Sequence, residues 1–274
     1  MIKKRLSFII VISILSIFAV ITLYPLFFVF VSSFKNNAEF YSSFFGFPSK
    51  LRWNNYVQIA SSVLTWLKNS GIYSSLNVLL DLTIASLAGY AFARFNFKYK
   101  EFFFMLVIML MMMPGVLLVI PMYVEVVNWH GLNTIWALIL PWTASDVPLG
   151  VFILRRFFQT QPMELFEAAK VDGASEFRIF TQIAIPLAAP ALTIVAILDI
   201  LFTLNDFLWP LLIMTKNSTE PLAVGMMNYS GSSGGVITWG NIFAAYALAM
   251  IPMIIVFALF ARNFVNAITE GAIK

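Results

Sequence analysis

Long apolar stretches alternate with short polar ones along almost the whole chain. An α-helix rises about 1.5 Å per residue, so roughly 20 apolar residues cross the ~30 Å hydrocarbon core of a bilayer. Six stretches reach this length and predict six transmembrane helices: residues 7–31, 71–92, 102–124, 134–154, 187–214 and 242–264. The composition agrees, because 61% of the 274 residues are hydrophobic and only 11% are charged. The pattern predicts an all-α integral membrane protein.

The predicted helices form one polytopic domain, since no segment outside them is long enough to bury a core of its own. We expect three consecutive parts: residues 1–68 with the first transmembrane helix and an external segment, residues 69–264 with a core of five transmembrane helices and a cytoplasmic loop at about 155–186, and a cytoplasmic tail at 265–274. The external segment would end in a short helix around residues 53–67, near the bilayer interface. The first apolar run exceeds about 15 residues, so we expect this helix to be retained rather than cleaved as a signal peptide.

Lys and Arg are distributed unevenly between the two sides that six spans define. With the amino terminus inside, twelve of the 17 basic residues fall on the cytoplasmic side and five fall outside. Short loops rich in Lys and Arg stay in the cytoplasm. We therefore expect both termini to be cytoplasmic, and the net charge of +4 to reflect this orientation rather than nucleic-acid binding.

Some positions inside the spans favour breaks or close packing. Pro114 follows a run of methionines in the third predicted helix, and proline kinks a helix because it lacks an amide hydrogen. Such prolines either line a pathway or are simply tolerated within the bilayer. Ala85 and Gly89 lie four residues apart in the second predicted helix, a spacing that permits close approach of another helix.

A charged segment, residues 167–186, separates the fourth and fifth predicted spans and must lie in water. Residues 163–171 contain good helix formers, with Pro162 at the start of the helix. Gly173 can adopt the left-handed conformation that ends a helix, and residues 175–183 would form a second short helix. The segment therefore predicts a cytoplasmic helix-turn-helix on a membrane protein.

The residues of this segment also follow a spaced pattern: Glu167, Ala168, Ala169, Gly173, Ile183, Ile185 and Pro186. Their order closely resembles the EAA loop, the cytoplasmic coupling loop of permease subunits in bacterial ATP-driven (ABC) importers. Ile185 departs from the pattern, because the family more often has Leu there. Asp172, directly before Gly173, further resembles the carbohydrate-uptake branch, the maltose-type permeases. The resemblance runs from about Asn69 to Lys274 and touches the first helix.

This resemblance implies the type-1 ABC importer fold with a cytoplasmic coupling helix, in the bacterial cytoplasmic membrane. It implies transport of a sugar, and we expect this sugar to be an oligosaccharide rather than a monosaccharide. The implied partners are a second homologous permease subunit in a heterodimer, two ATPase subunits and an extracytoplasmic sugar-binding protein. The residues expected to contact the ATPase groove are Leu165, Phe166, Glu167, Ala168, Ala169, Asp172 and Gly173. The alternative for this loop is a plain cytoplasmic connector.

Four acidic residues fall within predicted spans, with no Lys or Arg at comparable depth: Asp81, Asp146, Asp199 and Asp206. An Asp near mid-bilayer costs roughly 2.5 to 3.5 kcal/mol on insertion scales, so each should face protein or water. Helical spacing places Ser74, Asn77 and Asp81 on one face, and Asp199, Thr203 and Asp206 on another. The residues expected either to line a translocation path or to join helices by hydrogen bonds are Asn77, Asp81, Asp199, Asn205 and Asp206. Asn205 and Asp206 also resemble the family's fifth helix, although Leu204 replaces a frequent Trp.

Several chemistries are not expected of this chain. It lacks the Gly-x-x-x-x-Gly-Lys-Ser/Thr phosphate loop, so we expect no enzyme activity, and partner ATPase subunits would use ATP and Mg²⁺. It has no cysteine, and we expect the single His130 to lie at the surface or in packing, so no cofactor or metal is expected. Two alternatives stay open: a proton-coupled secondary transporter with Asp81, Asp199 or Asp206 as relay, and an ABC permease for a non-sugar solute.

Overall fold

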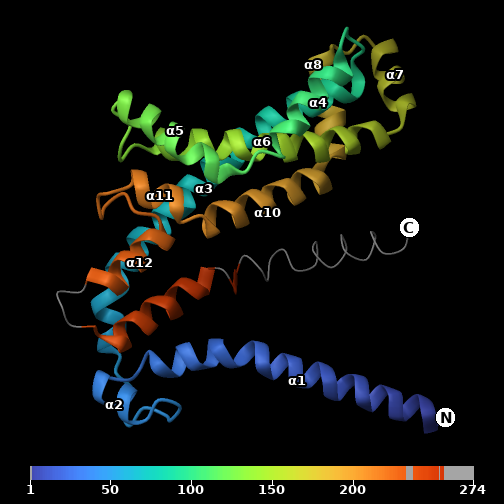
Figure 1. Cartoon of the computed structure of the whole chain (residues 1–274). Coiled ribbons are helices and arrows are strands. Elements are labelled where there is room, and N and C mark those ends of the chain that lie inside the picture. The colour runs from blue at the N-terminus through green and yellow to red at the C-terminus, as the bar shows by residue number, and fades with distance from the viewer. Residues whose placement is uncertain (1, 233–236, 253, 256–274) are drawn as a thin grey trace. The chain divides into compact units, whose positions relative to one another are not determined.

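The computed structural model describes residues 2–232, 237–252 and 254–255, and the regular elements in these ranges are all helices (Figure 1). They are α1 (Ile2–Ser32), α2 (Asn37–Ser42), α3 (Asn54–Arg94), α4 (Lys100–Leu110), α5 (Gly115–Asn128), α6 (Ile135–Thr160), α7 (Met163–Val171), α8 (Glu176–Ile179), the π-helix η1 (Phe180–Ala184), α9 (Ile185–Leu187), α10 (Ala189–Asn205), α11 (Leu208–Ile213), α12 (Leu222–Ser232) and a last helix, Trp239–Pro252. The prediction of an all-helical fold is confirmed for the described residues.

Three helices are long and apolar enough to cross a bilayer: Phe8–Ser32 within α1, α3 and α6. Two further pairs pass the same test together, each bent at a short break: α4 with α5, and the stretch from α8 to α9 with α10. The described residues therefore hold three to five candidate spans. The sixth predicted span, residues 242–264, is described only in part, because residues 253 and 256–264 lie outside the described ranges.

Proline chemistry explains the break between α4 and α5. Pro114 cannot donate a backbone hydrogen bond and disfavours helical geometry in the residue before it. It adopts an extended conformation, with φ −62° and ψ 115°, and the two helices bend by 89° around it. The predicted third span is therefore interrupted at the predicted residue.

The predicted span 187–214 is not one helix. It bends by 75° at Ala188, next to Pro190 in the first turn of α10. It then stops at Asn205, because Asp206 is extended, with ψ 121°. The Asp206 carboxylate instead accepts a hydrogen bond of 3.2 Å from the amide of Leu208, at the start of α11. Local side-chain bonding of Asp to the backbone competes with the helix here.

The described residues form two compact units, which fall within 1–67 together with 225–255, and within 68–224. α3 starts in the first unit and ends in the second. The short helix expected around residues 53–67 is the first part of α3, since the 41 residues of this helix contain no proline that would end it.

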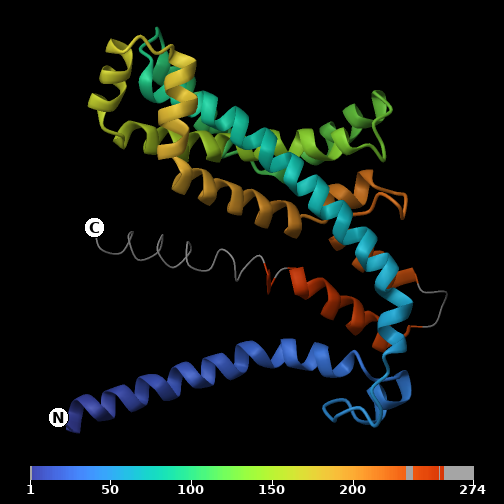
Figure 2. The ribbon, with the colours of Figure 1, turned by 180° about the vertical axis from the view of Figure 1, so that it is seen from behind.

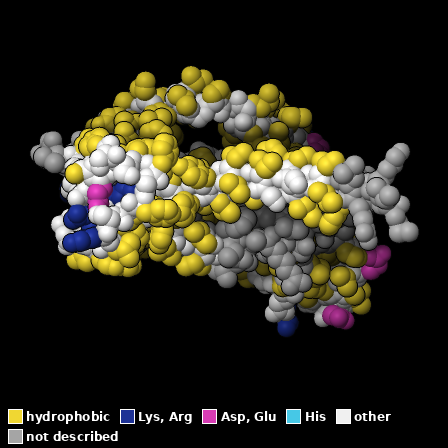
Figure 3. Space-filling view, turned by 90° about the horizontal axis from the view of Figure 1, so that it is seen from below, with side chains coloured by type: hydrophobic (Ala, Val, Ile, Leu, Met, Phe, Trp, Pro, Cys, Tyr) yellow, Lys and Arg dark blue, Asp and Glu magenta, His cyan; other side chains and the backbone are white. Residues whose placement is uncertain are grey.

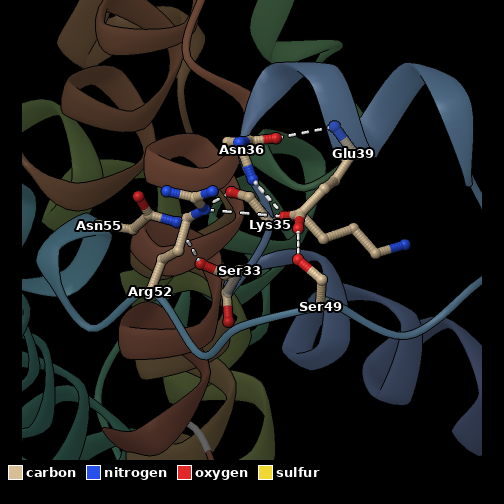
Figure 4. A network of polar contacts seen from close by, with 7 residues as sticks. All are labelled: Ser33, Lys35, Asn36, Glu39, Ser49, Arg52 and Asn55. Carbon is tan, nitrogen blue, oxygen red and sulfur yellow. Dashed lines mark hydrogen bonds and ion pairs between the residues drawn. The ribbon is translucent and has the colours of Figure 1, made fainter.

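In the first unit, the segment between α1 and α3 folds around a buried lysine (Figure 4). The side chain of Lys35 is 1% exposed and donates to the carbonyls of Ser43 at 2.9 Å and Phe44 at 2.8 Å. Burial lowers the pKa of Lys35, and the nearby Glu39 carboxylate opposes this shift. Asn55 donates to the carbonyl of Lys35 at 3.0 Å. Lys35 therefore satisfies backbone acceptors that the loop cannot pair by itself.

A capping box holds the start of α2 in the same network. The amide of Glu39 donates to the side chain of Asn36, and the Asn36 amide donates back to the Glu39 carboxylate. Glu39 also accepts from the hydroxyl of Ser49 and lies 3.7 Å from the Arg52 guanidinium. The Ser49 hydrogen bond is the main reason that the pKa of Glu39 is lowered.

Hydrophobic side chains cover much of the described surface seen in Figure 3, and charged side chains form only small groups there. From Phe8 to Ser32, α1 contains no charged residue, and apolar side chains such as Ile14 and Phe18 are exposed. A helix with this character belongs in lipid or against another subunit.

The core of the second unit is centred on α6, which packs against α10, α4, α11 and α5. The carboxyl-terminal half of α3 lies in front of α6 in Figure 2 and packs closely against it. A Cβ atom at Gly89 would lie 3.0 Å from the Arg155 amide nitrogen. A Cβ atom at Gly150 would lie 2.8 Å from the Ala85 side chain. The close approach predicted from Ala85 and Gly89 is thus observed.

Candidate functional site

α7 and α8 form the helix-turn-helix expected between the fourth and fifth spans. α7 covers residues 163–171, and the chain turns at Gly173, where φ is +78°. The Gly173 amide donates to the Lys170 carbonyl at 3.0 Å, and the Ala174 amide donates to the Ala169 carbonyl at 3.0 Å. A left-handed glycine after the last helical residue is the usual device for ending a helix. Lys170 also pairs with Glu176 across the turn at 2.6 Å.

The outer face of this hairpin is both polar and apolar. Glu167, Ala168, Asp172 and Gly173 are exposed, and Ala169 is half-buried. Large apolar side chains are also exposed: Leu165 at 46%, Val171 at 87% and Phe177 at 70%. Exposed apolar side chains of this size on a charged hairpin are typical of a protein-protein contact.

Phe166 does not lie on this outer face. Its side chain is 2% exposed and belongs to the core cluster that contains Tyr90 and Phe158. It therefore fixes α7 to the second unit. Leu165 and Phe166 are neighbours in sequence, but successive helical side chains point about 100° apart, so only one faces outward.

Arg94, the last residue of α3, joins α3 to the start of α7. Its guanidinium carbon lies 3.9 Å from the centre of the Phe166 ring. It donates to the Gln161 carbonyl at 2.9 Å and lies 3.2 Å from the Met163 sulfur. Arg combines stacking with directed hydrogen bonds in a way that Lys cannot.

Gln161 extends this contact to the helix that follows the hairpin. Gln161 is the C-cap residue of α6 and is 7% exposed. Its side-chain amide donates to the Ala184 carbonyl at 3.1 Å. Ala184 ends the π-helix η1, which runs directly on from α8. π-Helical turns are uncommon and often mark functional places in a helix. The ends of α3, α6 and η1 are thus joined at one point beside α7.

A second arginine ties α6 to α4. Arg155 is buried, pairs with Glu101 at 2.5 Å, and lies 3.8 Å from the centre of the Phe104 ring. The sequence shows Arg94 and Arg155 only as basic residues that set orientation. Their contacts depend on residues more than 50 positions away, which no local pattern reveals.

Deeper in the second unit, polar side chains meet between α3 and α6. Asn77 is fully buried, donates to the Asp146 carboxylate at 2.8 Å and accepts from the Thr143 hydroxyl at 2.8 Å. Ser74, also on α3, shares a hydrogen bond of 2.7 Å with Thr203 on α10. Asn77 therefore joins two helices in this structure.

Asp81 on α3 and Asp199 on α10 also meet inside the second unit. Asp81 is 0% and Asp199 is 4% exposed, and their carboxyl groups interact directly with each other.

Asn205 and Asp206 lie near the other end of α10. Asn205 is exposed and donates to the carbonyl of Leu201 in its own helix. Asp206 is half-buried and accepts a hydrogen bond of 2.6 Å from the Trp142 indole. The five polar residues that the sequence grouped together are thus divided: Asn77, Asp81 and Asp199 lie between helices, and only the last two reach the surface of the chain.

A family model described as "Binding-protein-dependent transport system inner membrane component" matches residues 82–270. This match covers more than half of the chain, and the chain belongs to that family. It is therefore a permease subunit of an ABC importer and an inner membrane component, as the EAA-like loop predicts.

Relatives match the chain over nearly its full length. It is 35% identical over 263 residues to the trehalose/maltose transport system permease protein of Thermococcus litoralis, with 93% of each chain covered. It is 33% identical to the arabinooligosaccharides transport system permease protein of Halalkalibacterium halodurans, covering 93% of this chain and 92% of that one. It is 30% identical to the diacetylchitobiose uptake system permease protein of Streptomyces coelicolor, covering 96% and 87%.

Solved structures share the fold. A chain of a bacterial ABC transporter involved in the import of the acidic polysaccharide alginate has a TM-score of 0.82 at 20% identity, over 95% of this chain and 97% of that one. A chain from a bacterial alginate ABC transporter in complex with an alginate pentasaccharide-bound periplasmic protein has a TM-score of 0.63 at 14% identity, over 98% and 96%. The backbone fold is therefore that of an ABC importer permease.

Proposed function

We propose that this chain is one half of a heterodimeric ABC importer permease that moves an oligosaccharide across the cytoplasmic membrane. The observation that carries the proposal is the exposed α7 hairpin, anchored by Arg94 and Phe166, on a chain of this family. The sugar cargo is supported by the sugars for which three relatives are named, which are trehalose or maltose, arabinooligosaccharides and diacetylchitobiose. Asp172 before Gly173 adds support from the sequence.

α7 acts as the coupling helix that receives the motion of the ATPase subunits. Glu167 is exposed and can pair with a basic residue of a partner, while Ala168 lets the partner's surface approach closely. Leu165 supplies apolar contact at 46% exposure. Gly173 forms the turn that presents these residues, and Asp172 is the C-cap residue of α7.

Phe166 and Arg94 carry the motion from α7 into the membrane. Phe166 packs into the core of the second unit, so displacement of α7 moves that core. Arg94 connects the same point to α3, and Gln161 connects it to η1. A coupling helix held in this way works as a lever rather than as a loose connector.

ATP and Mg²⁺ are used by two separate ATPase subunits, and this chain is not itself an enzyme. A second, homologous permease subunit completes the pore, and an extracytoplasmic sugar-binding protein delivers the cargo. Six spans cross the bilayer, with both termini and α7 in the cytoplasm. The core of five spans covers residues 69–264 and is followed by the cytoplasmic tail at 265–274, which lies outside the described residues.

Asn205 and Asp206 are the residues of this chain that we propose to lie along the translocation path. Both reach the surface of the isolated chain, and their amide and carboxylate groups suit hydrogen bonds to sugar hydroxyls. Asn77, Asp81 and Asp199 are assigned to packing between helices, because their exposed fractions are 0%, 0% and 4%.

Transport by the purified complex in sealed vesicles tests the function. We expect labelled oligosaccharide to accumulate only when ATP is present on the side of α7 and the binding protein is on the other side. Uptake that persists without ATP and follows a pH gradient would instead make the chain a proton-coupled transporter. ATP-driven uptake of a non-sugar solute, with no oligosaccharide uptake, would refute the cargo alone.

A further inference from the structure

The carboxyl groups of Asp81 on α3 and Asp199 on α10 form a pair sealed inside the second unit. Their exposed fractions, 0% and 4%, are those of the chain alone, so burial does not depend on a partner. α6 closes the third side, because a Cβ atom at Gly150 would lie 3.0 Å from a carboxylate oxygen of Asp81. Val195 on α10 also borders this contact.

No hydrogen-bond donor from the described residues satisfies this pair. Both carboxylate oxygens of Asp81, and one of Asp199, are buried without such a partner. The polar neighbours are already engaged, since Asn77 bonds to Asp146 and Ser74 bonds to Thr203. In a well-packed interior, such orphaned acceptors need an explanation.

The charged groups that act on the pair are acidic. Asp146 on α6 acts on Asp199, and Asp206, directly after α10, acts in turn on Asp146. Residues 69–93, 135–154 and 187–215, which supply the packing helices, contain no Lys or Arg. A compensating basic side chain is therefore absent from these segments.

Electrostatics limits the protonation state of the Asp81–Asp199 pair. Two ionised carboxylates in contact repel strongly at low dielectric, and two such groups sharing a site do not both ionise. An ionised carboxylate buried without a partner costs several kcal/mol. One proton held between them gives an O–H···O⁻ hydrogen bond, which is short and strong.

We propose that Asp81 and Asp199 bind a proton between them, and that the resulting hydrogen bond fastens α3 to α10 beside Gly150. The ligand is a proton rather than a metal ion, because the described residues contain no group of three or more acidic or histidine side chains that could hold a metal. The proton stays in place as a structural element and is not transported. The bond makes separation of α3 from α10 depend on proton occupancy, whatever the cargo is.

Infrared difference spectroscopy of the full chain, purified with its partner subunits in lipid nanodiscs, tests this site. A neutral carboxylic acid gives a carbonyl stretch that shifts on deuteration. We expect this band in the wild type at neutral pH and its loss in both Asp81→Asn and Asp199→Asn, since the amide then donates to the remaining carboxylate. Glu125→Gln, which changes an exposed carboxylate, is the matched control and should leave the band unchanged.

A band that is unchanged in both Asn variants would overturn the proposal. An infrared band of the Asp81–Asp199 pair that appears only when sodium ions are in the buffer would overturn it too, because the ligand would then be a metal cation. If neither variant folds, labelling the wild-type chain with ¹³C-aspartate keeps the test available. The acid band must then shift with the label, and no shift would refute an aspartic acid pair.

Thermal unfolding tests the fastening role. The melting temperature of the wild type should fall at alkaline pH, when the shared proton leaves two facing charges. Asp199→Asn should show a clearly smaller fall, because its amide replaces the proton while Asp146 and Asp206 remain. Equal falls in the two proteins, or proton release in step with transport, would contradict a resident structural proton.

Discussion

The guanidinium carbon of Arg94 lies 3.9 Å from the centre of the Phe166 ring, at the point where the end of α3 meets α7, the proposed coupling helix. Arg94 also donates to the Gln161 carbonyl, and Gln161 reaches the end of η1. One side chain thus joins the coupling helix to two membrane helices. This contact explains how a nine-residue helix, with few buried residues of its own, can be held rigidly.

Arg94→Lys should weaken coupling without preventing folding. Lys keeps the charge but loses the planar stacking and the directed donors of Arg. We expect ATP hydrolysis to continue with less transport per ATP, a loss of about 1 to 3 kcal/mol in coupling, or roughly 5- to 150-fold. The ratio of sugar transported to ATP hydrolysed in vesicles measures this. The exposed Arg156→Lys is the control, and equal ratios in both variants would show that Arg94 has no coupling role.

Gly150→Ala should destabilise the second unit. The added methyl group would lie 2.8 Å from Ala85 and 3.0 Å from Asp81, where α3 and α6 are in close contact. Overpacking of this kind costs about 1 to 3 kcal/mol. Gly71→Ala is the matched control, because a methyl group there meets nothing within 4 Å. A melting temperature that is lower only for Gly150→Ala supports the close packing, and equal melting temperatures would contradict it.

Lys35→Met should loosen the segment between α1 and α3 in the first unit. The change keeps most of the buried volume but leaves the Ser43 and Phe44 carbonyls without their donor. Each buried polar group without a partner costs about 1 to 3 kcal/mol. Limited proteolysis should therefore cleave residues 36–52 faster than in the wild type. The exposed Lys50→Met is the control, and similar cleavage of both variants would be evidence against a supporting role for Lys35.

The local features of the fold could be predicted from the sequence. The turn at Gly173, the helix 163–171 and the break at Pro114 depend on the chemistry of one or two residues, so their sequence signals are strong. The close approach at Gly89 also followed from residue size.

The long-range contacts could not be predicted. Arg94 and Phe166 are 72 positions apart, and Asp81 and Asp199 are 118 apart, so only the packed structure pairs them. Helical spacing put the polar residues on common faces, but it could not distinguish a face toward another helix from one toward a water-filled path. The same ambiguity grouped Phe166 with the exposed Leu165.

Glu167→Lys should break the contact between α7 and the ATPase subunits while leaving the chain itself intact. Glu167 is exposed on the hairpin, so reversing its charge removes no contact inside the chain and opposes a basic partner. We expect normal membrane insertion and a melting temperature close to that of the wild type. Gly173→Pro should have a similar effect on the partners, because proline cannot adopt the φ of +78° that the turn requires.

The central claim is that α7 receives the motion produced by ATP hydrolysis. The most direct measurement is ATP-driven oligosaccharide uptake by vesicles carrying the Glu167→Lys or Gly173→Pro complex, together with the amount of ATPase subunit that co-purifies with each. The account predicts that both variants insert into the membrane and lose uptake, through loss either of the ATPase subunits or of coupling. Retained ATPase subunits and wild-type uptake in both variants would contradict it.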